Sequence, residues 1–224
     1  MWSRFRFVGR LGPADAVTVA NAVLGFVAAV LAPDAPELAA RLVLTAAIAD
    51  ALDGIVARRY GGTAAGPYLD ALADVASFGV VPALLVAHRA TAAWSDPTLR
   101  ALGVALPALY VAMAVVRLGL YSAYDAEADE TEGVQTTLAA TVLAAGVLAG
   151  LVTTPALVAL TGVLAVLMVT RVTYPDLHPQ DASVMGMVQG AAVLTRGWVG
   201  RGFAYALLFL ALAYLVLAPR HYWD

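Results

Sequence analysis

The sequence predicts an all-α membrane protein: a polytopic bundle of six core transmembrane helices with one or two C-terminal accessory helices. Of its 224 residues, 62% are hydrophobic and 13% are charged, compared with roughly 25% charged residues in soluble domains. The mean hydropathy is +0.81. We expect one membrane-embedded domain over residues 1–224, with a catalytic core at about 14–175 and an accessory segment at about 180–220.

Each predicted span approaches the ~20 apolar residues that cross a bilayer, and Pro, Gly or charged residues separate one from the next. The six core spans are expected at 14–32, 37–59, 67–88, 100–121, 134–152 and 155–173. In the accessory segment, residues 184–195 are apolar but short, whereas 203–218 are long enough to cross. The acidic run 125–132 is expected to be a solvated loop.

The distribution of basic residues predicts which side of the membrane each end faces. All thirteen basic residues are arginine, and arginines gather before the first span and at the ends of the second, fourth and sixth. Because positively charged loops favour the cytoplasm, the N-terminus is expected on the cytoplasmic side of the cell (plasma) membrane. The net charge of −3 argues against nucleic acid as a partner, and the absence of cysteine excludes thiolate metal sites.

Four aspartates stand at helical spacing in the second and third predicted spans. Asp50 and Asp53 are three residues apart, and Asp70 and Asp74 are four apart, so each pair shares one helix face. Two such helices side by side form a cage of carboxylates, a donor set that binds hard cations such as Mg²⁺ or Mn²⁺. Burying carboxylates at membrane depth costs roughly 2.5–3.5 kcal/mol each, which favours a function over chance.

Small and basic residues next to these aspartates suggest a diphosphate-binding site. Gly54 removes a side chain beside the carboxylates and allows a ligand or helix to approach closely. Arg58 lies near the predicted membrane edge, where its guanidinium can hold an anionic group through two parallel hydrogen bonds. The aspartates are therefore expected at the cytoplasmic end of the bundle rather than at its midplane.

The complete pattern is Asp50-x-x-Asp53-Gly54-x-x-Ala57-Arg58, seven residues, Gly66-x-x-x-Asp70-x-x-x-Asp74. It resembles the signature of the CDP-alcohol phosphotransferase family, integral membrane enzymes that make phospholipids, although the loop before Gly66 is one residue shorter than usual. The resemblance implies two divalent cations (Mg²⁺ or Mn²⁺) held by the four aspartates, with Asp74 also the general base. The residues implied to contact the CDP-lipid are Gly54, Ala57, Arg58, Thr63, Gly66, Thr18 and Asn21.

Sequence outside the signature resembles the phosphatidylserine and archaetidylserine synthases within this family. The similar segments are Thr18-x-x-Asn21-x-x-x-Gly25, Asp74 through Ala83, Gly133 through Thr137, and Met168-Val169-Thr170 with Tyr174-Pro175. Gln135 stands where that subfamily has proline. The resemblance implies L-serine as the acceptor, CDP-diacylglycerol or CDP-archaeol as the donor, CMP as the second product, and a homodimer.

Two arginines at predicted cytoplasmic helix ends, Arg117 and Arg171, are candidates for holding the carboxylate of serine. Both are equally well interpreted as anchors that orient the protein in the membrane. Two other functions stay open. The same chemistry with glycerol phosphate or inositol phosphate as acceptor calls for more basic residues, and a divalent-cation transporter calls for carboxylates along a pathway.

Overall fold

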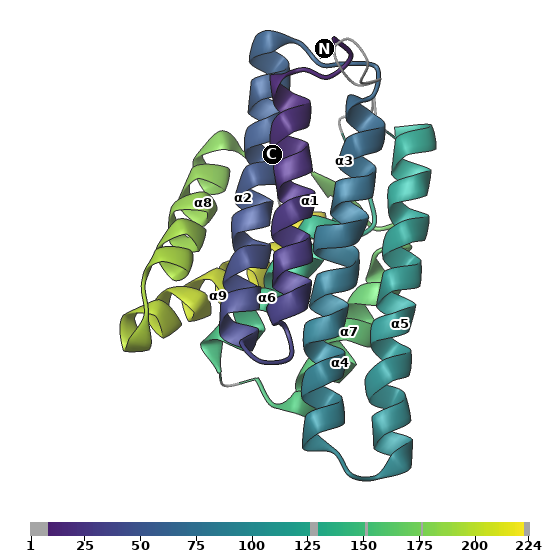
Figure 1. The fold of residues 1–224 in the computed structure, drawn as a ribbon, viewed down its shortest axis with the longest axis vertical. Coiled ribbons are helices and arrows are strands. Elements are labelled where there is room, and N and C mark those ends of the chain that lie inside the picture. The colour runs from purple at the N-terminus through teal and green to yellow at the C-terminus, as the bar shows by residue number, and fades with distance from the viewer. Residues whose placement is uncertain (1–8, 126–129, 151, 176, 222–224) are drawn as a thin grey trace, which may run out of the picture.

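The computed structural model describes residues 9–125, 130–150, 152–175 and 177–221, which form a helical bundle (Figure 1). Its α-helices are α1 (Pro13–Leu31), α2 (Pro36–Tyr60), α3 (Gly66–Asp74), α4 (Val81–Ala93), α5 (Pro97–Leu120), α6 (Thr136–Ala149), α7 (Thr154–Leu167), α8 (Pro179–Leu194) and α9 (Gly197–His221). Two π-helical segments, η2 (Val75–Val80) and η3 (Tyr121–Asp125), and two strands, β1 (Glu130–Glu132) and β2 (Thr173–Pro175), complete the described part. The predicted helical bundle is confirmed.

Helices α3, η2 and α4 run on as one continuous rod over Gly66–Ala93. Pro82 lies at the start of α4, and because proline has no backbone N–H it cannot donate to the carbonyl of Phe78 four residues earlier. The hydroxyl of Tyr110, on α5, donates to that carbonyl at 3.0 Å. The π-helical segment thus follows directly after Asp74, a placement common for π-bulges at functional sites.

Helix α6 lies at the centre of the bundle. Every residue from Leu138 to Ala149 is buried, the pattern of a helix surrounded by neighbours, and α6 packs against α2, α9 and η2. Helix α1 packs against both α2 and α3, and α5 packs on α7 (Figure 1).

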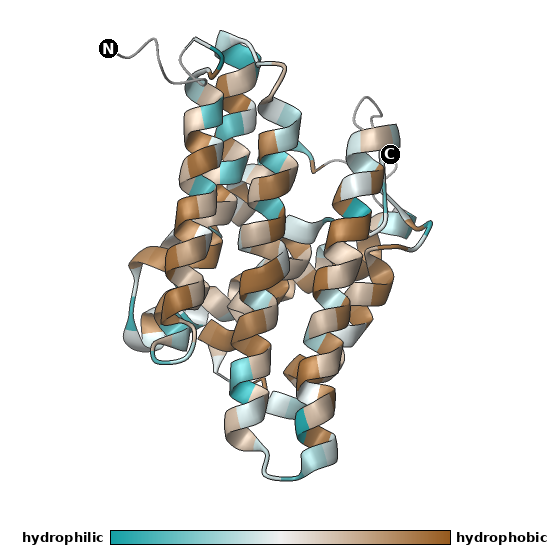
Figure 2. Ribbon diagram, turned by 45° about the vertical axis from the view of Figure 1, so that its right-hand side comes forward, coloured by the Kyte–Doolittle hydropathy of each residue, from teal (hydrophilic) through white to brown (hydrophobic). Residues whose placement is uncertain are grey.

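Within the described part of the chain, four helices are long and apolar enough to cross a membrane: Pro13–Leu31, Gly66–Ala93, Pro97–Tyr124 and Gly197–Arg220. Figure 2 shows hydrophobic residues along most of the helical length and hydrophilic residues concentrated toward the ends. Apolar side chains such as Val23, Phe26 and Val30 are exposed on α1, as expected for a surface that faces lipid. The chain is therefore membrane-embedded.

The fifth and sixth predicted spans are shorter in the structure than in the sequence prediction. Helices α6 and α7 have 14 residues each, or about 21 Å at ~1.5 Å per residue. Gly150, with φ of +74°, ends α6 in the left-handed conformation. The expectation of helix as far as residue 173 is wrong, because the chain turns after Leu167 and continues into β2.

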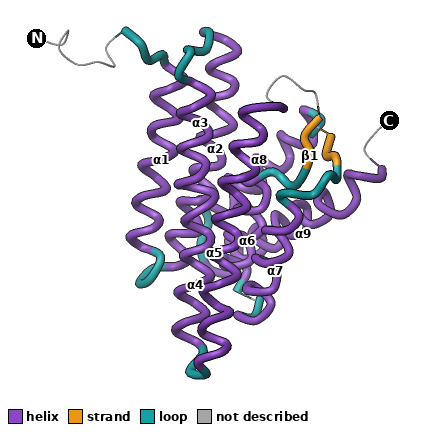
Figure 3. Tube along the Cα trace, turned by 90° about the vertical axis from the view of Figure 1, so that its right-hand side faces the viewer, coloured by secondary structure: helices purple, strands orange, loops and turns teal. Residues whose placement is uncertain are grey.

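The described ends of the acidic run differ from the predicted solvated loop. Its described ends belong to η3 and to β1, and β1 pairs antiparallel with β2 so that Thr131 faces Tyr174 (Figure 3). The middle of the run, 126–129, lies outside the described residues. The pairing joins the segment before α6 to the segment after α7.

Both accessory helices are present: α8 packs against α2, and α9 packs against α6 and α8. The guanidinium of Arg41, on α2, donates to the carbonyls of Ala192 and Thr195 at 2.6 Å each, at the C-terminal end of α8. The buried side-chain amide of Gln189 donates to the carbonyl of Leu44 at 2.8 Å. Residues 184–195, interpreted from the sequence as apolar but short, thus belong to a helix that packs on the core.

Gly25 allows α1 to lie directly against η2, and replacing it with alanine is expected to destabilise the fold. An added Cβ at Gly25 would lie 2.4 Å from the hydroxyl and 2.9 Å from Cα of Ser77, while that hydroxyl donates to the carbonyl of Asn21 at 2.9 Å. Such overpacking costs about 1–3 kcal/mol of unfolding free energy. Thermal unfolding in detergent should show a lower Tm for Gly25→Ala.

The matched control is Gly186→Ala in α8, where an added Cβ meets nothing within 4 Å. Alanine is favoured over glycine inside a helix by about 1 kcal/mol, so this variant should keep or raise the Tm. Equal behaviour of the two variants would contradict the close helix contact at Gly25.

Candidate functional site

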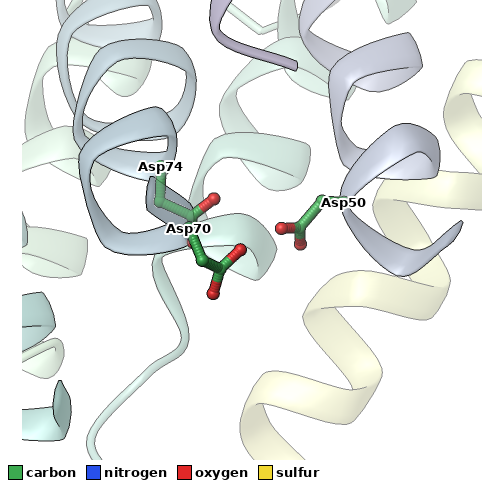
Figure 4. A group of neighbouring side chains, drawn as sticks. All are labelled: Asp50, Asp70 and Asp74. Carbon is green, nitrogen blue, oxygen red and sulfur yellow. The ribbon is translucent and has the colours of Figure 1, made fainter. Parts of the chain in front are cut away.

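The site forms where the C-terminal part of α2 meets α3. Gly61 ends α2 with φ of +90°, a conformation that favours glycine, and the chain returns through a short loop into α3. The carboxylates of Asp50, Asp70 and Asp74 then converge, each offering an oxygen that lies within 4.8 Å of the others. Figure 4 shows Asp50 pointing from α2 toward Asp70 and Asp74 on the neighbouring helix. We call these three side chains the carboxylate cluster.

Asp53, the fourth predicted aspartate, is buried but takes a different partner. Its Oδ2 accepts a hydrogen bond of 2.6 Å from the hydroxyl of Thr18, on α1. It lies outside the group of three that share the 4.8 Å limit. The predicted set of four carboxylates is therefore divided in this structure, with three in contact range of one another and one held by α1.

The carboxylate cluster has the chemistry of a cation site. Three carboxylates at this separation repel one another when ionised. The Oδ1 atom of Asp74 is buried and has no hydrogen-bond partner within the described part of the chain, although buried polar atoms are nearly always satisfied. A hard divalent cation, which prefers carboxylate oxygens, would satisfy this atom and remove the repulsion.

On one side of the cluster lies a cavity of about 340 Å³ between α1, α2 and α3, which we call the α1–α3 cleft. Its lining residues are Ala14, Asp15, Thr18, Asp53, Gly54, Ala57, Gly62, Thr63, Gly66, Pro67, Asp70 and Tyr121. Five of the residues that the resemblance assigns to the CDP-lipid are among them, namely Thr18, Gly54, Ala57, Thr63 and Gly66. The structure therefore brings most of the predicted set into one cleft.

Arg58 and Asn21, the remaining members of that set, are placed differently. Arg58 is exposed at the edge of α2, with its guanidinium folded back so that a Cβ on Gly54 would lie 3.4 Å from it. Asn21 is fully buried and does not line the cleft, and its amide atoms have no hydrogen-bond partner among the residues described.

Asp15 is a site residue that the sequence did not predict. It is buried at the start of α1, and its Oδ2 accepts from the backbone N–H of Gly12 at 2.7 Å and from the hydroxyl of Thr63 at 2.8 Å. Its Oδ1 lies 3.4 Å from the position of a Cβ on Gly66. An acidic residue in the first turn of a helix is ordinarily explained by the helix dipole, so the sequence carried no signal that would distinguish it.

A second cavity of about 230 Å³, between α3, α5 and α6, is lined by Asp70 and Asp74 of the cluster, and we call it the α5–α6 cleft. Its lining residues are Pro67, Asp70, Ala71, Asp74, Arg117, Leu118, Tyr121, Ser122, Thr131, Gln135, Thr136 and Thr137. Pro67, Asp70 and Tyr121 line both clefts. The two cavities therefore adjoin at Asp70, a member of the carboxylate cluster. The hydroxyl of Thr137, in the α5–α6 cleft, donates to Oδ2 of Asp50 at 3.4 Å.

Of the two arginines predicted to bind the acceptor, the structure places one in this cleft. Arg117 is buried, donates to the hydroxyl of Thr136 at 3.5 Å and lies 5.7 Å from the ring centroid of Tyr121. Arg171 is exposed and lines neither cleft. Gln135 precedes α6 with φ of −60°, a value that proline also adopts, so its presence in place of proline keeps the start of the helix.

Comparison with known proteins identifies the family. Residues 12–220 match the CDP-alcohol phosphatidyltransferase family. An archaetidylserine synthase of Methanothermobacter thermautotrophicus is 28% identical over 173 residues, which is 75% of this chain and 72% of that protein. CDP-diacylglycerol–serine O-phosphatidyltransferases of Mycobacterium bovis and Mycobacterium tuberculosis are 35% identical over 111 residues, which is 49% of this chain and 37% of theirs. The chain belongs to the CDP-alcohol phosphatidyltransferase family.

Proposed function

We propose that this enzyme transfers the phosphatidyl or archaetidyl group of a CDP-lipid to the hydroxyl of L-serine and releases CMP. The observation that carries the proposal is that two cavities adjoin at Asp70, a member of the carboxylate cluster. In the proposal the α1–α3 cleft holds the nucleotide and is the nucleotide cleft. The α5–α6 cleft holds the acceptor and is the acceptor cleft, and the reacting phosphorus lies where the two clefts meet. The names of the similar proteins, which refer to archaetidylserine and to serine, support serine as the acceptor.

In this proposal the nucleotide occupies the α1–α3 cleft and its diphosphate faces the carboxylate cluster. Asp50, Asp70 and Asp74 would hold two divalent cations, Mg²⁺ or Mn²⁺, and Asp53 would be a further ligand once the nucleotide is bound. Bound cations neutralise the diphosphate and the departing CMP. Gly54 and Gly66 leave room for the nucleotide, because a side chain at either position would narrow the cleft.

Asp15 places a negative charge in the nucleotide cleft, which repels a phosphate group and attracts hydrogen-bond donors. Its carboxylate is an acceptor only, and two donors within the protein fix its Oδ2 atom. Since like charges repel, the diphosphate belongs near the cations, and the donor groups of the nucleoside belong near Asp15. Thr63, whose hydroxyl holds Asp15 and whose oxygen accepts from the N–H of Gly66 at 3.1 Å, keeps this wall in place.

The chemical step is a direct displacement at phosphorus. The serine hydroxyl oxygen forms the new P–O bond, the bond from phosphorus to CMP breaks, and the hydroxyl proton passes to the carboxylate of Asp74. Asp74 lines the acceptor cleft, so its carboxylate is within reach of a bound alcohol. An aspartate is a weak base toward an alcohol, which requires proton transfer to accompany the attack on phosphorus.

Arg117 is the residue that we propose binds the carboxylate of serine, and Arg117→Gln is expected to raise the KM for serine. Hydrogen bonds to charged groups contribute about 1.5–3 kcal/mol, so the increase should be about 10- to 150-fold, with the KM for the CDP-lipid changed far less. Steady-state rates at varied serine and fixed CDP-lipid measure it.

Arg100→Gln is the matched control for this prediction, since Arg100 is exposed at the opposite end of the same helix. Equal increases in both KM values of Arg117→Gln would contradict a specific role toward serine. Arg171 stays a sequence prediction without support from the cleft geometry. The KM of Arg171→Gln for serine shows whether Arg171 or Arg117 binds the acceptor.

The function itself is tested with the purified protein in detergent, Mn²⁺, labelled serine and either CDP-diacylglycerol or CDP-archaeol. CMP release that depends on serine, together with label in the lipid product, supports the proposal. CMP release that requires glycerol phosphate or inositol phosphate instead would keep the chemistry and replace the acceptor. Metal flux into liposomes without CMP release would favour the transporter. The CDP-lipid that gives the higher rate of CMP release is identified as the donor.

The proposal places the enzyme in the plasma membrane as a homodimer, with the carboxylate cluster facing the cytoplasm. The arginines near the cluster end of the bundle, among them Arg10, Arg58 and Arg59, support this orientation. Labelling of single cysteines introduced at exposed loop positions, in intact cells and in lysed cells, would reveal the opposite orientation if present.

A further inference from the structure

Two tyrosine hydroxyls connect α9 to β2 in opposite directions. The hydroxyl of Tyr174, in β2, donates to the carbonyl of Leu215 at 3.2 Å, and the hydroxyl of Tyr214, in α9, donates to the carbonyl of Pro175. Both side chains are buried, and their ring centroids are 6.2 Å apart with an angle of 36° between the planes. We call these two residues the tyrosine pair.

The carbonyl that Tyr174 binds lacks its usual donor within the helix. In an α-helix the carbonyl of Leu215 would accept from the N–H of residue 219, but that residue is Pro219, which has no N–H. A buried carbonyl without a donor is costly. The proline therefore creates an acceptor on α9 for a hydroxyl from outside the helix, and Tyr174 supplies it.

The strand held by the tyrosine pair forms part of the support for the α5–α6 cleft. Tyr174 lies opposite Thr131 in the β1–β2 pairing (Figure 3), and Thr131 lines that cleft. Directly after β1, the N–H of Gly133 donates to the carbonyl of Val172 at 2.8 Å, and the N–H of Val134 to that of Leu167 at 3.1 Å.

The connection is short because cleft residues follow at once in the sequence. Gln135, Thr136 and Thr137 come immediately after Val134 and line the same cleft. The path from α9 to the cleft wall thus passes through the two tyrosine hydrogen bonds, the β1–β2 pairing and the short segment 133–135 that leads into α6.

We propose that Tyr174 and Tyr214 are positioning residues for the acceptor, and that α9 thereby sets the shape of the α5–α6 cleft. This inference rests on the proposed function of that cleft. It assigns a role to the C-terminal helix, which carries none of the aspartates and lines neither cleft. Among the described residues that line the α1–α3 cleft, none belongs to β1, β2, α9 or the segment 133–137.

The test compares Tyr174→Phe and Tyr214→Phe with Tyr205→Phe. Tyr205 is a partly buried tyrosine on α9 that forms no side-chain hydrogen bond with the described part of the chain. Each phenylalanine removes one hydroxyl and keeps the ring. In the first two variants the KM for the acceptor should rise about 3- to 10-fold, as expected for a net hydrogen bond, while the KM for the CDP-lipid stays unchanged. Tyr205→Phe should change neither.

Hydrogen–deuterium exchange over residues 130–137 gives a second readout that needs no substrate. Exchange there should accelerate in Tyr174→Phe and Tyr214→Phe, and exchange in α1 should stay as in the wild type. A lower Tm with neither the faster local exchange nor the acceptor-specific KM change would overturn the positioning role. If serine proves to be the wrong acceptor, the exchange result still decides this inference and the kinetic arm is repeated with the acceptor found.

Discussion

Asp70→Asn is expected to reduce the rate of CMP release by roughly 10²- to 10³-fold, the loss seen when one preorganised electrostatic group is removed from an active site. Asp70 belongs to the carboxylate cluster and lines both clefts. Asparagine keeps the size of the side chain and replaces a charged oxygen ligand by a neutral amide. The measurement is CMP release at saturating substrates over a range of Mn²⁺ concentrations, where more Mn²⁺ should be needed for half-maximal rate.

A thermal unfolding experiment separates loss of a ligand from loss of the fold. Without metal, Asp70→Asn removes one of three mutually repelling charges, so its Tm should equal or exceed that of the wild type. With Mn²⁺, the wild type should gain more stability than the variant, because a cation stabilises the state to which it binds. Asp34→Asn, in the exposed turn between α1 and α2, should match the wild type in both experiments. A Mn²⁺-induced rise in Tm as large in Asp70→Asn as in the wild type would contradict a ligand role for Asp70.

The helical period predicted correctly that Asp50, Asp70 and Asp74 would lie close together, because it fixes which residues share a face of a helix. Asp50 and Asp70, twenty residues apart, meet as expected once α2 and α3 lie side by side. The period does not state what else approaches that face. Asp53 is on the same side of α2 as Asp50, but its carboxylate accepts a hydrogen bond from Thr18 of α1 and lies outside the cluster. Sequence spacing within one helix carries no information about a third helix.

The sequence resemblances named segments without predicting their contacts. Gly133 belongs to one such segment, Val172 lies between the two parts of another (Met168-Val169-Thr170 and Tyr174-Pro175), and the two residues are hydrogen-bonded in the fold. Strands of three residues, such as β1 and β2, are too short for an alternating pattern to be detected, so the sheet could not be predicted. Asp15 was missed for a similar reason, since its importance depends on Thr63 and Gly66, which come about fifty residues later.

Asp74→Asn is expected to lower kcat by about 10²- to 10⁴-fold, the usual contribution of a positioned general base. Asp74 lines the acceptor cleft but not the nucleotide cleft, so the KM for the CDP-lipid should change less than kcat. The amide cannot take the proton of the serine hydroxyl. The measurement is a pair of saturation curves, one for each substrate, at the Mn²⁺ concentration that saturates this variant.

Asp74 is proposed both to bind a cation and to accept a proton, and a comparison with Asp70→Asn separates the two roles. If proton transfer dominates, excess Mn²⁺ should recover part of the rate of Asp70→Asn but little of that of Asp74→Asn. Asp74→Glu retains a carboxylate at a shifted position and should keep more activity than Asp74→Asn. Full activity of Asp74→Asn would remove Asp74 as the base. The proton would then have to leave through another group of the acceptor cleft, and Asp70, which faces both cavities, would be the next candidate.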